Sequence, residues 1–403
     1  MTERPPVTGG GLPLSGIHVL DLTQYVSGPF CTMLLAELGA DVIKVEPPGT
    51  GDVYRHQGPS FLGGVSTSFL SMNRNKRSLT LDLKRAEARE VVRRLAGRVD
   101  AVVENFKPAT AERLGVGYEA LRAINPELVY CSISGYGHTG PNAGLGGYDL
   151  MAQARGGIMA VTGPGEDTPT KVGVPIVDLG TGVYAALGIT ASLLARERGN
   201  GGGRIDLGLL DTAVSFLPML LTEYQATGVL PRPLGNASPF FAPYEVFRTK
   251  DGFITLVGTG GKDHWESLCA VLGLPELPDD SRFATNSDRV ARRAELHELL
   301  EAVLVTETSE HWIGGMRAAG LPCDPLQNLD AVLEDPQVKS RGMIGSYLHP
   351  QAGSVAFAAS PLAVEGGRTV APPPLLGQHT REVLGWLGFS DREVEGLEAA
   401  GVV

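Results

Sequence analysis

The chain has 403 residues, of which 43% are hydrophobic and 20% are charged, and its formal net charge is −11. This length and composition are typical of a globular protein with room for two domains and a large core. The negative charge excludes a nucleic-acid-binding protein that relies on bulk attraction. A polyanionic small ligand would therefore need a local basic patch.

Four cysteines, Cys31, Cys131, Cys269 and Cys323, lie far apart in the sequence, without a CxxC motif or a Cys/His cluster. This usage is typical of reduced thiols and indicates neither a disulfide framework nor a metal site, so we expect a cytoplasmic protein without bound metal. No apolar run approaches 18 residues without a charge or a break, and the N-terminus lacks the apolar core of a signal peptide. We therefore expect no membrane partner.

The chain starts with a pattern of strand, tight turn, helix and strand. Residues 18–23 and 41–46 are short apolar runs typical of strands, and Pro29 opens a helical segment that lasts to Gly39. This spacing predicts a βαβ unit and hence an α/β fold with a parallel sheet. The turn between strand and helix is not GxGxxG, and no GxxxxGK[ST] occurs, so the dinucleotide and P-loop signatures are absent.

Basic residues gather just after this unit, within twelve positions of an acidic protein: Arg74, Lys76, Arg77, Lys84 and Arg85. They indicate either a solvated surface or an edge that collects phosphate groups. Further strands are predicted at 100–103 and 128–132, and a loop rich in polar residues and glycine follows each. Open α/β sheets bind ligands at the carboxyl ends of their strands, so we expect the site there.

The segment 173–177 is an apolar run that ends at Asp178, ahead of a helical pattern over 183–198. At the start of a helix a carboxylate meets unpaired N–H groups and the positive end of the helix dipole. Asp178 is then either an N-cap or a nucleophile that attacks a thioester, with Gly180 and Gly182 allowing close approach. The nucleophile needs a carboxylate that is ionised yet poorly hydrated.

Composition also divides the chain. The stretch 228–243 is rich in proline and glycine, and an Asp-Gly hairpin signal at 250–252 opens a separate unit with helical patterns behind it. The predicted division is a large domain over 1–227, a linker over 228–243, a small α+β domain over 244–320, a second linker over 321–345, and a C-terminal part over 346–403 that returns to the large domain.

Several motifs, each weak alone, occur in an order and spacing that resemble the family III coenzyme A transferases, or CaiB/BaiF family, over residues 12 to 403. These motifs are Gly28-Pro29, the run 39–46, Asn75–Ser78, Glu104–Phe106, Gly135–Gly137, Gly147–Asp149 and the run 374–380. The group includes formyl-CoA transferase and the carnitine CoA-transferases, and alpha-methylacyl-CoA racemase is related to it.

The resemblance implies that Asp178 attacks an acyl-CoA thioester to give an aspartyl anhydride and then an aspartyl-CoA thioester, from which a small carboxylic acid takes the CoA. CoA or its acyl ester is then a substrate, and no cofactor is bound permanently. The implied CoA contacts are Val26, Ser27, Leu81, Asp82, Leu83, Lys84, Asn105, Phe106, Arg113 and Tyr148, with Gly235 and Asn236 in a lid over the substrate.

One departure concerns the substrate, because formyl-CoA transferase has a glutamine where this chain has Val26. This difference puts oxalate or formate in doubt as a substrate. The resemblance also implies a Rossmann-like large domain built from both termini, a small domain joined by two linkers, and two chains interlocked as rings in a homodimer.

Two alternatives to the transferase remain: an acyl-CoA racemase or epimerase of the same superfamily, and a non-catalytic CoA-binding protein with this fold. The racemase branch has a histidine where this chain has Tyr148. A neutral tyrosine is a poor partner for abstracting an α-proton near neutral pH, so Tyr148 favours transfer. The sequence does not name the acyl donor or the acceptor acid.

Overall fold

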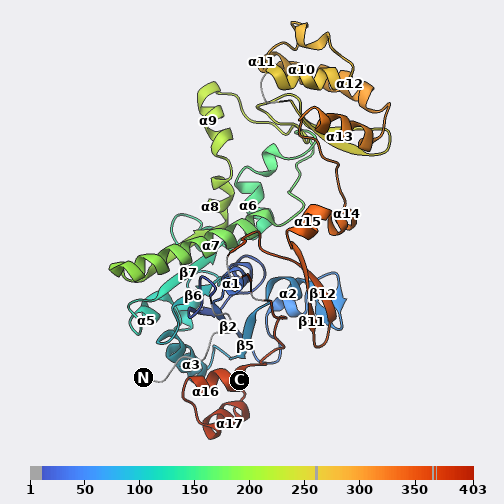
Figure 1. Cartoon of the computed structure of the whole chain (residues 1–403). Helices are drawn as coiled ribbons and strands as arrows, with labels where there is room; N and C mark the ends of the chain where they lie inside the picture. Colours follow the sequence, from blue (N-terminus) through green and yellow to red (C-terminus); the bar gives the residue numbers. More distant parts are fainter. Residues whose placement is uncertain (1–10, 259–261, 365–366, 369) are drawn as a thin grey trace. The chain divides into compact units, whose positions relative to one another are not determined.

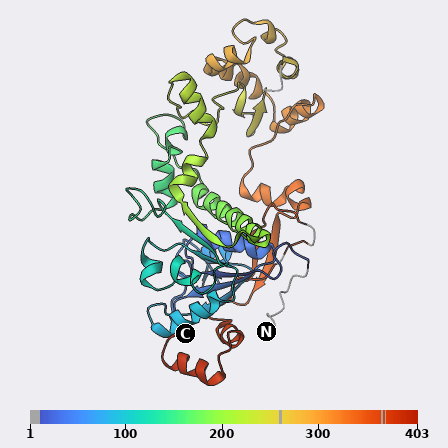
Figure 2. The same ribbon diagram turned by 90° about the vertical axis from the view of Figure 1, so that its left-hand side faces the viewer.

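The computed structural model describes residues 11–258, 262–364, 367–368 and 370–403. The chain divides into two compact units (Figures 1 and 2). Unit 1 comprises Met1–Gly157, Gly173–Leu217 and Ser340–Val403, and unit 2 comprises Ile158–Val172 and Pro218–Lys339. The chain therefore leaves unit 1 twice and returns to it each time.

Two segments group differently from the predicted division. Residues 158–172 and 218–227 belong to unit 2, although the sequence placed both in the large domain. A β-bridge joins Gly163 to Gly235 within unit 2, and the Gly235 N–H donates to the Gly163 carbonyl at 2.8 Å. The two predicted linkers stay predictions.

Unit 1 is built on a six-stranded sheet in the order β5-β2-β1-β6-β7-β8, with every neighbouring pair parallel. This confirms the predicted α/β class with a parallel sheet. The strands are β1 (His18–Asp21), β2 (Asp41–Glu46), β5 (Lys76–Thr80), β6 (Ala101–Glu104), β7 (Val129–Ser134) and β8 (Gly203–Gly208).

Helices cover both faces of the sheet. Successive side chains of a strand point to opposite faces, so neighbouring residues of β1 pack against different sets of helices. Val19 of β1 packs in a cluster with α1 and α7, and Leu20 packs with α3, α16 and α17. The C-terminal helices thus return to the sheet beside α3 (Figure 1). The helices of unit 1 are α1 (Ser27–Glu37), α2 (Thr67–Met72), α3 (Ala86–Ala96), α4 (Thr110–Arg113), α5 (Tyr118–Arg122), α6 (Asp149–Arg155), α7 (Ile176–Ala195), α8 (Leu209–Ser215), α16 (Thr380–Trp386) and α17 (Asp391–Ala399).

Two short hairpins complete unit 1: β3 (Phe61–Leu62) with β4 (Val65–Ser66), and β11 (Ile344–His349) with β12 (Gly353–Ala358). They share a small apolar cluster with α2, in which Tyr347 donates its hydroxyl hydrogen to the Leu70 carbonyl at 2.9 Å. This cluster ties the returning C-terminal segment to the N-terminal half of the unit.

Unit 2 contains the predicted hairpin, in which β9 (Tyr244–Arg248) pairs antiparallel with β10 (Phe253–Val257). Helices pack on it around a core that includes Phe247, Trp265 and Leu300. Its helices are α9 (Pro218–Thr227), α10 (Lys262–Val271), α11 (Asn286–Ala291), α12 (Arg293–Leu304), α13 (Ser309–Ala318), α14 (Leu329–Glu334) and α15 (Pro336–Ser340).

By length and composition, one helix in the described part of the chain, α7 with its continuation to Asn200, is apolar enough to cross a membrane. A single such helix is weak evidence, because the core helix of a soluble protein passes the same test. Ala185, Ile189 and Leu193 of α7 are buried in the core of unit 1. The expected absence of a membrane partner stays a prediction.

The basic run after the first βαβ unit is mostly internal, which overturns both interpretations for three of its members. Arg74 is buried against Glu37, with Nε 2.8 Å from Oε1, and the Lys76 ammonium lies 2.9 Å from Asp21. Arg77 pairs with Asp41 of the neighbouring strand. Each of these three cations is therefore paired with a carboxylate of the fold. Lys84 and Arg85 are exposed.

We expect Glu37→Gln to lower the free energy of unfolding by about 3–5 kcal/mol, because it leaves the Arg74 guanidinium buried without its counter-charge. The matched control is Glu87→Gln, whose exposed carboxylate lies 3.8 Å from Arg85 and should cost at most about 1 kcal/mol. Urea unfolding followed by circular dichroism measures both. Equal losses in the two variants would contradict the prediction.

Candidate active site

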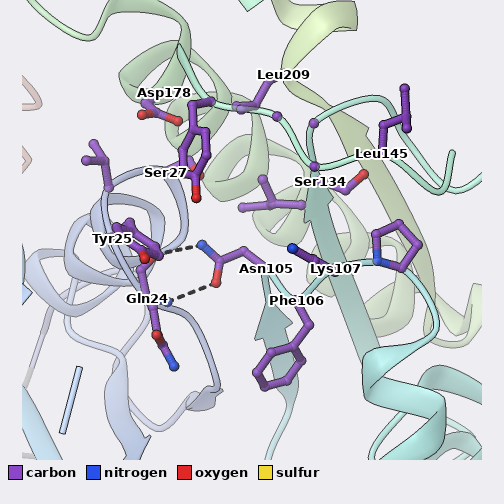
Figure 3. Close-up of a pocket in the computed structure, with 17 residues that line it drawn as sticks. Gln24, Tyr25, Ser27, Asn105, Phe106, Lys107, Ser134, Leu145, Asp178 and Leu209 are labelled. Atoms are coloured by element: carbon purple, nitrogen blue, oxygen red, sulfur yellow. Dashed lines mark hydrogen bonds between the residues drawn. The ribbon is translucent and has the colours of Figure 1, made fainter. Parts of the chain in front are cut away.

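A cavity of about 510 Å³ opens at the carboxyl ends of three adjacent strands, β1, β6 and β7 (Figure 3). This is the edge of the sheet where the sequence predicted the site. The lining comes from the loops that follow these strands and from the first turns of three helices, α1, α7 and α8: 24–27, 105–108, 133–135, 145–148, Asp178 and Leu209. All of these residues belong to unit 1.

The cavity brings together six of the predicted site residues, namely Val26, Ser27, Asn105, Phe106, Tyr148 and Asp178. The segment 81–84 and Arg113 lie outside its lining, as does the predicted lid, Gly235 and Asn236, which belongs to unit 2. Leu81 is buried in the core, so only its backbone is left for a ligand, and the Asp82 N–H donates to the Val402 carbonyl at 2.9 Å. The CoA contacts of 81–84 and Arg113 stay predictions.

Asp178 lies inside a helix and not ahead of one, which corrects the expected helix start at 183. Helix α7 begins at Ile176 and its N-cap position is Pro175, so Asp178 belongs to the first turn. The sequence suggested a later start because Gly180 and Gly182 disfavour a helix interior.

These two glycines serve close packing. A Cβ on Gly182 would lie 2.8 Å from the Ser27 carbonyl oxygen, at the first residue of α1, and a Cβ on Gly180 would lie 2.5 Å from the Phe216 ring. The tight contact with α1 therefore places the Asp178 turn of α7 against the Ser27 turn. It is this contact that puts both residues in one cavity wall.

The N-cap interpretation of Asp178 is wrong, because another carboxylate fills that role. The Asp149 Oδ1 accepts hydrogen bonds from the Val177 N–H at 2.8 Å and from the Asp178 N–H at 3.2 Å. Gln153 donates its amide hydrogen to the Asp149 Oδ2 at 2.6 Å. The free amides at the start of α7 are therefore occupied by a residue from α6.

This arrangement changes the expected charge of Asp178. Burial raises the pKa of Asp178 to about 7, and the negative charge of Asp149 adds to the shift. The sequence predicted a carboxylate held ionised by the helix start. In the structure the helix amides stabilise Asp149, so Asp178 holds its proton more strongly than an exposed aspartate does.

The loop 24–27 continues this wall, and hydrogen bonds hold it at Gln24. The Asn105 side chain accepts from the Gln24 N–H at 2.9 Å and donates to the Gln24 carbonyl at 2.6 Å. These bonds appear as dashed lines in Figure 3. The next residue, Tyr25, adopts a left-handed backbone with φ 68°, which is uncommon for a residue with a side chain. Asn105, a predicted CoA contact, thus fixes a strained turn of the wall.

Buried charged side chains hold the residue just ahead of the loop 24–27. The Lys44 ammonium donates to the Thr23 carbonyl at 2.7 Å and lies 2.8 Å from Asp52. Asp21 accepts from the Thr23 N–H at 2.9 Å. Burial raises the pKa of Asp21, but the Lys76 and Lys44 ammonium groups, together with hydrogen bonds from Thr23 and Thr32, outweigh burial and lower it to about 2. Asp21 therefore remains ionised and keeps the turn anchored throughout the physiological pH range.

Sequence reasoning missed several residues of the site. Tyr25 and Lys107 line the cavity, and Tyr54 lies near it: burial raises the pKa of Tyr54, and the Asp178 charge raises it further. The Tyr25 and Tyr54 rings meet edge to face, with centroids 5.4 Å apart. Lys107 directly follows the Asn105-Phe106 motif, so it was the one member with a signal in the sequence.

Gly135 and Gly147 also have a role that the motif alone did not show. A Cβ on Gly135 would lie 2.6 Å from the Cα of Gly147, so the two backbones touch. This contact closes the base of the loop 136–146 and fixes the position of Tyr148 and Asp149. The first helix after β7 is α6, which begins at Asp149.

The site offers carboxylate chemistry. Asp178 is the only acidic side chain in the lining, it is poorly hydrated, and its pKa allows it to be ionised or protonated near neutral pH. Among the described residues, no group of three or more His, Cys, Asp or Glu side chains is placed to hold a metal ion, and all four cysteines are free and buried.

Comparison with known proteins places this geometry in a family. A family model described as CoA-transferase family III matches residues 14–380. The succinyl-CoA:glutarate CoA-transferase of Homo sapiens is 39% identical over 97% of this chain and 90% of that protein. The acetyl-CoA:oxalate CoA-transferase of Acetobacter aceti is 39% identical over 91% of this chain and 92% of that protein.

The solved structures agree with the sequence comparisons. The crystal structure of a CaiB/BaiF family protein from Brucella suis has a TM-score of 0.82 and 38% sequence identity, and it covers 93% of this chain and 99% of that chain. Family model, full-length relatives and fold thus point to one conclusion, which also confirms the resemblance in the sequence motifs. The chain belongs to CoA-transferase family III and is an enzyme that transfers CoA between an acyl-CoA and an acid.

Proposed function

We propose that this enzyme moves CoA from an acyl-CoA, such as succinyl-CoA, to a small dicarboxylic acid of the glutarate class, with Asp178 as the nucleophile. The observation that carries this proposal is a half-buried carboxylate of raised pKa facing a cavity at the edge of the sheet. The substrate class is supported by relatives named for succinyl-CoA with glutarate or mesaconate as the acceptor.

Asp178 alone carries first the acyl group and then the CoA during the reaction. Its carboxylate oxygen attacks the thioester carbonyl, the C–S bond breaks, and CoA leaves as a thiolate while an aspartyl anhydride forms. The thiolate then attacks the Asp178 carbonyl carbon, which gives the aspartyl-CoA thioester and releases the first acid as a carboxylate. The acceptor carboxylate attacks this thioester, the C–S bond breaks, and CoA leaves as a thiolate while a second aspartyl anhydride forms. The thiolate then attacks the acceptor carbonyl carbon of this anhydride, which gives the new acyl-CoA and releases the Asp178 carboxylate.

The raised pKa of Asp178 suits this role. Burial disfavours the charged carboxylate, so the ionised form is less stabilised by water than an exposed aspartate and more reactive toward a carbonyl carbon. Asp149 adds repulsion in the free enzyme, and conversion of Asp178 to a neutral anhydride or thioester relieves that repulsion. The covalent intermediates are therefore favoured relative to the ionised ground state.

Asp178→Asn should lower kcat by about 10³-fold or more, because an amide cannot form the anhydride. Asp391→Asn, an exposed change in the first turn of α17, is the control and should retain activity. Borohydride or hydroxylamine added during turnover with succinyl-CoA should modify the peptide that contains Asp178, as read by mass spectrometry. An unmodified peptide in an active wild-type enzyme would contradict the covalent route.

Activity should rise with pH through the pKa of Asp178 near 7, because only the ionised carboxylate attacks. Asp149→Asn removes the repelling charge and keeps a carbonyl oxygen that can accept the α7 amides. The acid limb of kcat/KM should therefore move to lower pH in this variant, while burial keeps it above the limb of an exposed aspartate. A limb at unchanged pH would show that Asp149 does not set the ionisation of Asp178.

We also propose that the chain acts as the interlocked homodimer that the family resemblance implies. Support comes from apolar side chains left exposed on α7, including Val183 at 50%, Leu187 at 62% and Leu194 at 52% exposure. In unit 2, α9 exposes Met219, Leu221 and Tyr224. A soluble chain rarely leaves such faces uncovered.

Leu187→Glu should weaken this dimer, because it places a charge within a face that must be dehydrated on association. Light scattering after size-exclusion chromatography should give a dimer mass for the wild type and a monomer mass for Leu187→Glu. Leu348→Glu, the same change at an exposed leucine of β11, should stay dimeric. A monomeric wild-type protein would overturn the proposal.

A further inference from the structure

Gln153 of α6 is fully buried and bonds to the carboxylate that occupies the start of α7. It lies four positions after Asp149 on the same helix, so the two side chains share a face, and its amide nitrogen is 2.6 Å from the Asp149 Oδ2. Neither residue lines the active-site cavity. Gln153 can therefore affect the reaction only through other residues of the protein.

The donors around Asp149 select one arrangement of its side chain. The Val177 and Asp178 N–H groups bond to Oδ1, and the Gln153 amide bonds to Oδ2. Since both oxygens accept, the carboxylate fits this arrangement, and a protonated acid, which must donate from one oxygen, does not. Without the Gln153 amide, Oδ2 would lose its donor from α6, and the side chain could rotate away from the α7 amides.

The backbone positions around Asp149 are fixed independently of this bond. Helix α6 packs against α7 and α8. A Cβ on Gly156, at the end of α6, would lie 2.4 Å from the Ala213 Cβ of α8, so these two helices are in direct contact. The direction of the Asp149 side chain is what remains to be fixed, and the Gln153 amide fixes it.

Gln153 also bonds to Asp149 without neutralising it. Other titratable groups come from the neighbouring elements: Tyr54 after β2, Tyr148 and Arg155 at the two ends of α6, Asp178 of α7 and Asp211 of α8. Arg155 is the cation among them, and its guanidinium lies over the Tyr136 ring, 5.2 Å from the ring centroid. The Gln153 amide carries no charge. Burial and the negative charge of Asp149 therefore both raise the pKa of Asp178.

We propose that Gln153 is a positioning residue for CoA transfer: its amide holds the Asp149 carboxylate on the α7 amides, so that Asp178 remains the carboxylate that is free to react. The role of Asp178 in the reaction rests on the proposed function. The effect of Gln153 on the ionisation of Asp178 does not.

Two substitutions separate the hydrogen bond from the shape of the side chain. Gln153→Met keeps the length and removes the donor. Gln153→Glu keeps the shape, and while the new carboxyl is protonated it donates to Asp149 as the amide does.

The matched controls are Gln327→Met and Gln327→Glu in unit 2. The exposed Gln327 amide also donates to an aspartate, Asp335, at 3.2 Å. The other oxygen of Asp335 accepts the N–H groups of Gln337 and Val338 at the start of α15, so the same pattern recurs away from the active site.

Two readouts are measured in each protein. With succinyl-CoA and glutarate, kcat, KM and the pH dependence of kcat/KM report the reaction. In the substrate-free enzyme, NMR of labelled aspartate carboxyl carbons reports the ionisation of Asp178, whose signal is the one that Asp178→Asn lacks. Thermal unfolding checks that the variants are folded.

In Gln153→Met, kcat should fall by about tenfold while KM stays within about threefold, because Asp149 no longer holds the α7 amides and the Asp178 carboxylate becomes better stabilised and less reactive. Asp178 should also lose its proton at a lower pH in both readouts, since either the amides are freed or the repelling charge is reduced. The Gln327 variants should match the wild type.

Gln153→Glu should retain activity at low pH and lose it as the pH rises. Loss of the proton shared with Asp149 puts two like charges at hydrogen-bond distance, so kcat/KM should gain an alkaline limb that a residue serving only to fill space would not produce. A folded Gln153→Met variant with wild-type kcat or unchanged ionisation of Asp178 would overturn the assignment. A Gln153→Glu variant without the alkaline limb would overturn it as well.

The two proposals fail separately. If Asp178→Asn keeps its turnover while Gln153→Met still shifts the ionisation of Asp178 in the free enzyme, the proposed nucleophile is wrong and the effect of Gln153 on Asp178 stands. An enzyme that requires Asp178, but in which Gln153→Met leaves the ionisation of Asp178 unchanged, would support the nucleophile and overturn the role of Gln153.

Discussion

The hydrogen bonds from the first amides of α7 to the Asp149 carboxylate determine the chemistry of the rest of the site. A helix start stabilises one negative charge well, and in this protein that charge belongs to Asp149. Asp178, in the same turn, is left half-buried beside a like charge, and no cation is among the causes of its shifted pKa. The division of roles between two neighbouring carboxylates thus comes from which of them reaches the helix amides.

Hydrogen bonds and ion pairs outside the cavity hold its walls in place. The Asn105 side-chain amide forms hydrogen bonds with the Gln24 backbone. The residues just before Gln24 are held by two buried ion pairs, one between Lys44 and Asp52 and one between Lys76 and Asp21. Such pairs contribute little net stability when formed, yet removing one partner is costly, so they tolerate few alternative arrangements. The left-handed turn at Tyr25 persists because its neighbours on both sides are fixed.

Much of the fold was predictable from local sequence patterns. Short apolar runs between turn residues identified β1, β2, β6 and β7, and their common direction located the ligand-binding edge. The start of α7 was not predictable, because Gly180 and Gly182 have unfavourable helix propensity and their packing partners, Phe216 and Ser27, are distant in sequence. The buried state of Arg74 and Lys76 was missed for the same reason. Their carboxylate partners, Glu37 and Asp21, lie more than 30 residues away.

The backbone contact between Gly135 and Gly147 divides the connection from β7 to α6 into a loop, residues 136–146, and the short segment that leads into α6. Residues 136–146 form an excursion whose ends are already joined, so their length and composition can change without displacing Tyr148 or the helix behind it. Asp149, the carboxylate that caps α7, begins α6 two residues after Gly147. Its position therefore does not depend on the conformation of residues 136–146. The excursion can therefore change while the reacting carboxylate keeps its place beside Asp149.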